Sequence, residues 1–117
     1  MTSDEVWDLL GVIAVADRRT VGDADHKMWT ALVGDLAFAD CQAAVIAHYR
    51  DSTDWIMAKH IRDRVAEIRQ ERLRAAGPVE IPEELADNPA EALAWKQERV
   101  TAIADGRAKP QAIGGAK

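Results

Sequence analysis

Apolar residues recur at helical spacing through most of the first 76 residues of this chain. A helix that packs on a core carries an apolar residue every three or four positions, which places them on one face. This spacing predicts a first helix from Ser3 to the segment DRRTVGD and a second that begins at Asp23 or Asp25. It predicts a third helix over FADCQAAVIAHYR and a fourth over about 58–75. No strand pattern competes, so the sequence predicts an all-α fold.

Each predicted helix has an apolar stripe that we expect to be buried. The stripes are Val6, Leu9, Leu10 and Ile13; Met28, Trp29, Leu32, Val33 and Leu36; Cys41, Ala44, Val45, His48 and Tyr49; and Ile61, Val65 and Ile68. Between the third and fourth helices, Trp55, Ile56 and Met57 form a short apolar run after the polar turn DST. We expect these three residues to be a structural plug that closes the core, and not a recognition surface.

The sequence changes character after the fourth helix. Gly77 is a typical helix stop, and three prolines keep the following stretch largely extended, with a short helical turn at most. Asn88 followed by Pro89 is a helix start signal, so a fifth helix is expected to run to about Asp105. The predicted organisation is a four-helix domain over 1–76, a proline-containing linker over 77–88, and a C-terminal helical arm with a loose tail over 89–117.

Charge and composition narrow the classes of function and the cellular locations that we expect for this chain. The net charge of −5 over 117 residues argues against non-specific nucleic-acid binding by the whole surface. The single cysteine, Cys41, cannot form an internal disulfide, which favours a reducing compartment. The N-terminus is acidic where a signal peptide would be basic, and no apolar run approaches membrane-spanning length. We therefore expect a cytoplasmic protein that does not enter a membrane.

Motifs for catalysis or cofactor binding are missing from the sequence. The three histidines share no metal-ligand spacing with one another or with Cys41, and no glycine-rich phosphate loop is present. No serine, threonine or cysteine has the signature of an activated nucleophile. The sequence therefore predicts a protein that is not an enzyme, with no catalytic residues, no cofactor and no metal.

Two elements remain as candidate binding surfaces. The fourth helix carries Lys59, Arg62 and Arg69 beside its apolar stripe, a basic surface that could contact DNA phosphates or an acidic partner, or could be an ordinary charged face. The fifth helix could lay an apolar face into a groove on a partner, or could fold back on the domain. The residues of this arm face are Leu93, Trp95, Val100 and Ile103, with Trp95 as an anchor.

The region from about residue 4 to 72 resembles the small helical loader and inhibitor proteins with which phages control their replicative DNA helicase. The matching features are Trp29 with Val33, the turn Asp35-Leu36-Ala37-Phe38, and the alanine-rich helix that ends at Tyr49-Arg50. The polar turn and apolar run from Ser52 to Met57, and then Ile61, complete the pattern. This chain has Ala58-Lys59-His60 where the family tends to have a proline.

This resemblance implies an adaptor for DNA replication with no ATPase activity of its own. Its folded N-terminal part would contact an origin-binding or replisome-organising protein. Its C-terminal arm would bind the hexameric replicative helicase and control its loading onto DNA in the cytoplasm of the host cell, with weak or absent direct DNA binding. Two alternatives stay open: a small helical DNA-binding regulator that uses the basic helix 58–74, and another phage helical interaction or assembly protein.

Overall fold

A computed structural model describes residues 1–108, and every regular element in that range is helical. The elements are α1 (Ser3–Asp17), α2 (Asp23–Val33), α3 (Phe38–Asp51), α4 (Ala58–Ala76), a 3-10 turn, η1 (Glu83–Leu85), and α5 (Pro89–Ala104). The all-α prediction is confirmed, and the five α-helices lie where the hydrophobic pattern predicts them. No single helix in this range is long and apolar enough to cross a bilayer; α2 and α3 pass that test only as a pair, bent by 104°.

Local signals explain most of the helix boundaries. The hydroxyl of Thr2 accepts from the Glu5 N–H at 3.1 Å, and the Glu5 carboxylate accepts from the Thr2 N–H at 2.7 Å, so the cap of α1 is one residue earlier than Ser3. Asn88 caps α5 through the Glu91 N–H, as predicted. Gly77 follows α4 with φ +74°, a conformation that residues with a Cβ rarely adopt.

The chain divides into two compact units, and the division falls inside α4, between Glu67 and Ile68. This boundary differs from the predicted one at residue 76. The fully buried residues of α4 are Ile61 and Val65, both before the division, while Ile68 is only partly buried. The first part of α4 therefore belongs to the N-terminal unit and its remainder to the C-terminal unit.

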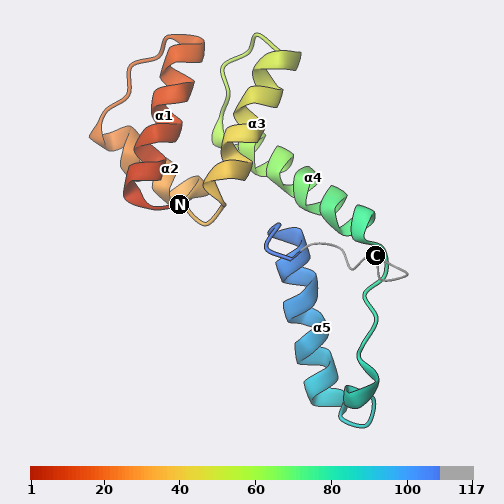
Figure 1. Ribbon diagram of the computed structural model, residues 1–117. Coiled ribbons are helices and arrows are strands. Elements are labelled where there is room, and N and C mark those ends of the chain that lie inside the picture. Colours follow the sequence, from red (N-terminus) through yellow and green to blue (C-terminus); the bar gives the residue numbers. More distant parts are fainter. Residues whose placement is uncertain (109–117) are drawn as a thin grey trace. The chain divides into compact units, whose positions relative to one another are not determined.

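The N-terminal unit has one hydrophobic core, built from α1, α2, α3 and the start of α4. Within it, α1 packs against both α2 and α3 (Figure 1). The core contains Val6, Leu9, Leu10, Ile13, Trp29, Val33, Cys41, Ala44, Val45, Ile56, Ala58, Ile61 and Val65. In α2 only Trp29 and Val33 are buried, while Met28 and Leu32 are exposed, so the predicted stripe of this helix was too wide. Every member of this core precedes Glu67.

The predicted structural plug is correct for only one of its three residues. Ile56 is fully buried in the core, but Trp55 is 56% exposed and Met57 is 55% exposed. The segment between α3 and α4 is not helical, so the three side chains do not share a helix face. Ile56 points into the core while its two neighbours lie largely in solvent.

The C-terminal unit joins the end of α5 to the second half of α4 through arginine side chains. Arg69 forms an ion pair with Asp105, and Arg72 donates to the Ala104 carbonyl at 2.9 Å. Both acceptors lie at the C-terminal end of α5, where the helix dipole favours positive charge. Ala102, Ile103 and Ala104 are buried at this end. The turn η1 contacts α5 near the other end.

We predict that Ile56→Ala destabilises the N-terminal unit by about 2–5 kcal/mol, because it removes a fully buried side chain and leaves a cavity. Trp55→Ala should change the free energy of unfolding by less than about 1 kcal/mol, because the indole is largely solvated. Urea unfolding followed by circular dichroism compares the two variants. Equal destabilisation by both would show that Trp55 is part of the core.

The Cys41 thiol offers a second test of this core. Burial raises its pKa to about 11, and the side chain is fully buried. Because the thiolate is the reactive form, the native protein should react with an aromatic disulfide reagent at pH 8 at least about a hundredfold more slowly than the protein in urea, where the thiol regains its ordinary pKa of about 8.5. Rapid labelling of the native protein would contradict the placement of Cys41.

Candidate interaction surfaces

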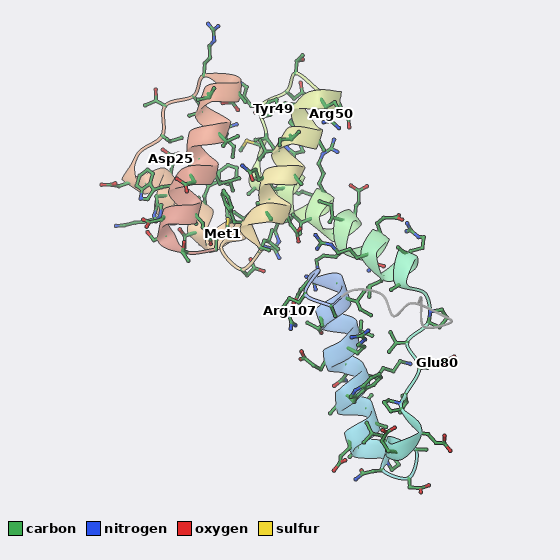
Figure 2. The ribbon with its side chains drawn as sticks, viewed as in Figure 1. Met1, Asp25, Tyr49, Arg50, Glu80 and Arg107 are labelled. Carbon is green, nitrogen blue, oxygen red and sulfur yellow. The ribbon has the colours of Figure 1, made fainter. Side chains whose placement is uncertain are left out.

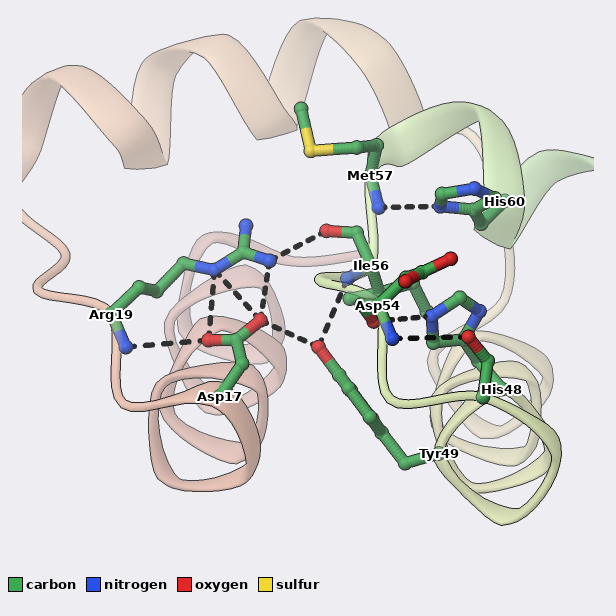
Figure 3. A network of polar contacts seen from close by, with 9 residues as sticks. Asp17, Arg19, His48, Tyr49, Asp54, Ile56, Met57 and His60 are labelled. Carbon is green, nitrogen blue, oxygen red and sulfur yellow. Dashed lines mark hydrogen bonds and ion pairs between the residues drawn. The ribbon is translucent and has the colours of Figure 1, made fainter.

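A network of side chains holds the segment between α3 and α4 in place (Figure 3). The Arg19 guanidinium donates to both carboxylate oxygens of Asp17, with the shortest contact at 2.5 Å, and also donates to the Ile56 carbonyl at 2.7 Å. The Tyr49 hydroxyl donates to Asp17 at 2.5 Å and accepts from the Ile56 N–H at 2.9 Å. Both backbone polar groups of Ile56 are thus bonded to side chains from other elements.

The local backbone brings Arg19 onto Asp17. Helix α1 ends at Asp17, and Arg18 follows with φ +60°, a left-handed conformation that is uncommon for a residue other than glycine. This sharp turn lets the Arg19 side chain reach back over the last residue of α1. Tyr49 comes from the last turn of α3, and Figure 2 labels it there. The network therefore ties the ends of α1 and α3 to the segment that follows α3.

Burial and hydrogen bonding act in opposite directions on this network. Burial raises the pKa of the Asp17 carboxyl, but hydrogen bonds from Arg19 and Tyr49 outweigh it, so the pKa lies below the ordinary value. For Arg19, burial lowers the pKa and the bond to Asp17 more than compensates, so the pKa is raised. Burial and the bond to Asp17 together raise the pKa of Tyr49. At neutral pH the network is therefore an ion pair with a neutral phenol.

Histidines and a serine fix the rest of the same segment. His48 is buried in α3 and its Nε2 donates to the Asp54 carbonyl at 2.8 Å, while the Asp54 N–H donates to the Ser52 hydroxyl at 3.0 Å. The Met57 N–H donates to Nδ1 of His60, in the first turn of α4, at 2.8 Å. We call residues 52–57 the anchored loop, because side chains bind its backbone at Asp54, Ile56 and Met57.

The anchored loop presents two apolar side chains to solvent. Trp55 and Met57 are each more than half exposed, and Figure 3 shows the Met57 side chain extending away from the polar network. The Arg19 guanidinium carbon lies 4.9 Å from the centre of the Trp55 ring and 6.0 Å from that of Trp29, so cation–π attraction also restrains the exposed indole. The sequence analysis missed this surface, because three consecutive apolar residues carry no signal of which side chain is buried.

The predicted basic surface is divided between the two units, and each of its residues has an acidic partner. Lys59 pairs with Asp63 at 2.9 Å and Arg62 makes a two-pronged contact with Asp35 at 2.7 and 3.2 Å. Arg69 belongs to the C-terminal unit and pairs with Asp105. A DNA phosphate would have to compete with these carboxylates, which weakens the DNA-binding alternative.

The predicted arm face is only partly available. Ile103 is buried and Val100 is partly buried, so the C-terminal half of α5 is largely covered. Leu93 is 57% exposed and Trp95 is partly buried. The candidate partner-binding part of the arm is therefore its N-terminal half, around Leu93 and Trp95. The expected loose tail after residue 108 lies outside the described residues.

Comparison with known proteins gives no relative for this chain: no family model, no curated protein and no solved structure matches it. Among residues 1–108, no group of three or more histidine, cysteine, aspartate or glutamate side chains is placed to hold a metal ion. The candidate surfaces must therefore be judged from their own geometry.

We predict that Asp17→Asn costs about 3–5 kcal/mol of stability at pH 7, because it leaves the Arg19 charge without its partner in a largely buried position. Since the pKa of Asp17 is lowered by folding, its contribution is fully present above the unfolded value of about 3.9 and is lost as the pH falls through the folded value. The difference between wild type and variant should therefore shrink below about pH 4.

Denaturant unfolding at a series of pH values measures this difference. Tyr49→Phe is the matched comparison: it removes one donor and one acceptor but no charge, and should cost about 1–3 kcal/mol. Because the Tyr49 hydroxyl also lowers the pKa of Asp17, only part of this smaller cost should be lost at low pH, while the contact with the Ile56 N–H should persist. A pH-independent difference for Asp17→Asn would show that the carboxylate is not held in an ion pair.

Proposed function

We propose that this protein is a phage-type accessory factor of DNA replication that binds the hexameric replicative helicase and controls its loading onto DNA, without ATPase activity of its own. The resemblance of residues 4–72 to helicase loader and inhibitor proteins supports the assignment. The all-α fold and the division into two units are compatible with it. An adaptor needs a separate surface for each partner, and each unit offers one apolar surface.

The observation that carries the helicase assignment is the uneven burial of α5. Arginines of α4 bind the C-terminal end of α5 through Asp105 and Ala104, and Ile103 is buried beside them. The N-terminal half of the same helix leaves Leu93 in solvent. A helix held at one end with an apolar face at the other can dock into a groove without first having to fold, which lowers the entropic cost of binding.

In the proposed mechanism the helicase is held by the C-terminal unit while the N-terminal unit contacts the protein that marks the loading site. Residues of α4 contribute to both units. Release of the helicase would follow when DNA or the second partner competes for the same surfaces. The adaptor supplies position and timing, and the helicase supplies ATP hydrolysis.

We predict that Leu93→Ala with Trp95→Ala in the full-length chain weakens binding to the replicative helicase of its own genome or host at least about tenfold, or 1.4 kcal/mol. Truncating apolar residues at a groove contact commonly costs this much or more. Biolayer interferometry with immobilised helicase measures the affinity. Circular dichroism checks that α5 stays folded.

Ile81→Ala is the matched control, because Ile81 is exposed, lies in the same unit and is outside α5. It should leave helicase binding within about twofold of wild type. If the wild-type protein does not bind the helicase, the proposed function is wrong. If it binds but the double variant binds as tightly, the assignment of the contact to α5 is wrong.

A further inference from the structure

The anchored loop holds an exposed indole on an ordered backbone. Side chains from α3 and α4, and from the segment after α1, bind its backbone at Asp54, Ile56 and Met57. The need to bury Ile56 in the core explains why the backbone of the loop is held in this way. It does not account for two large apolar side chains, Trp55 and Met57, at neighbouring outward positions.

A third exposed apolar residue, Leu32, lies at the end of α2, a helix that contacts both α4 and Arg19. Arg62, in the second turn of α4, donates to the Leu32 carbonyl at 3.0 Å, which places the end of α2 beside the N-terminal part of α4. The Arg19 guanidinium contacts the rings of both Trp29, in α2, and Trp55, in the anchored loop, and so connects α2 to the loop. Leu32 is 43% exposed. We define the Trp55 surface as Trp55, Met57 and Leu32.

The charges around the Trp55 surface select its partner. Arg19, Arg62 and Lys59 are neutralised by Asp17, Asp35 and Asp63. Within residues 1–108, Asp54 is exposed beside Trp55 and its carboxylate belongs to no ion pair. The chain through Glu67 has twelve acidic residues against seven basic ones, so this unit carries the whole net charge of −5. The remainder of the chain is neutral.

We infer that the Trp55 surface is a docking site for a basic segment of a partner protein with apolar residues at its centre. Tryptophan is enriched among the residues that contribute most to binding energy at interfaces, and methionine adapts to the shape of the group that it meets. Because the loop backbone is already ordered, binding would not have to restrain it. The net negative charge of the unit would steer a basic segment toward the surface and repel an acidic one.

This inference concerns the N-terminal unit and does not depend on the helicase assignment. The helicase assignment and the docking site can fail separately. Variants of Leu93 and Trp95 test the helicase contact, whereas variants of Trp55 and Met57 test the docking site. A second copy of this chain is a less suitable occupant, since two N-terminal units of charge −5 repel each other. Self-association is nevertheless one outcome that the experiment measures.

The probe is a fluorescein-labelled peptide of about 14 residues, with leucines at helical spacing and lysines elsewhere. A second peptide has glutamate in place of every lysine. Fluorescence anisotropy at about 0.15 M salt measures binding to the full-length protein. The lysine peptide should bind at least about tenfold more tightly than the glutamate peptide, and Trp55→Ala with Met57→Ala should weaken it at least about tenfold, or 1.4 kcal/mol.

Ile46→Ala is the control for the loss of an exposed apolar side chain outside the Trp55 surface, because Ile46 is exposed on α3 in the same unit. Asp54→Asn should weaken binding more than Asp8→Asn, which removes the same charge from an exposed position on α1. Equal binding of the loop variant and wild type would overturn the inference, and so would equal effects of the two asparagine variants. Sedimentation that shows a dimer lost with Trp55→Ala would assign the surface to a second copy and also overturn it.

Discussion

The ion pair between Asp17 and Arg19 is the interaction on which the N-terminal unit depends most. It lies where α1 ends, and through Tyr49 and the Ile56 backbone it connects three parts of the chain that are distant in sequence. It fixes the segment after α3 at Ile56, whose backbone has no helical or sheet hydrogen bonds of its own, while His48 and His60 hold the same segment at Asp54 and Met57. The position of α4 in turn depends on that segment, since the helix begins two residues after Ile56.

The same ion pair illustrates how a buried charge can determine structure without adding much net stability. Removing two charges from water costs several kcal/mol per ion, and their attraction roughly repays that cost only if the remaining hydrogen-bonding groups are satisfied. Here Tyr49 and the Ile56 carbonyl satisfy them, and among the described residues no buried side-chain polar atom lacks a partner. What the ion pair provides is a single preferred arrangement of the loop, because moving the loop away would leave a charge or a carbonyl group buried and unpaired.

The sequence was sufficient to predict the helices because each has its own local signals. The stripe of Val6, Leu9, Leu10 and Ile13 is buried as expected, and Asn88 and Gly77 act at helix boundaries as expected. The course of the loop could not be predicted in this way, since it depends on Asp17, Arg19 and Tyr49, whose meeting is a tertiary event. Three consecutive apolar residues were expected to share one environment, but in this non-helical segment Ile56 is buried and its two neighbours are exposed.

The candidate surfaces were harder to predict than the core, because exposure depends on what the rest of the chain covers. The arm face was expected to include Ile103, but a helix of 16 residues can be buried at one end and exposed at the other. Arg62 and Arg69 were expected to act on one surface, but they pair with Asp35 and Asp105 in different units. Helical periodicity assigns residues to a face, whereas the partner of each residue on that face is set by tertiary structure.

The anchored loop separates the requirements of folding from those of recognition. The loop is held by hydrogen bonds to its backbone and by the buried side chain of Ile56. The side chains of Trp55 and Met57 are therefore not needed to hold the loop in its course. Residues at these two positions can therefore change the partner, or the affinity for it, with little effect on the core. A substitution at Ile56, by contrast, acts on the core and on both outward side chains together. The loop is thus rigid in its backbone and free in its outward residues, which is the combination that a binding surface requires.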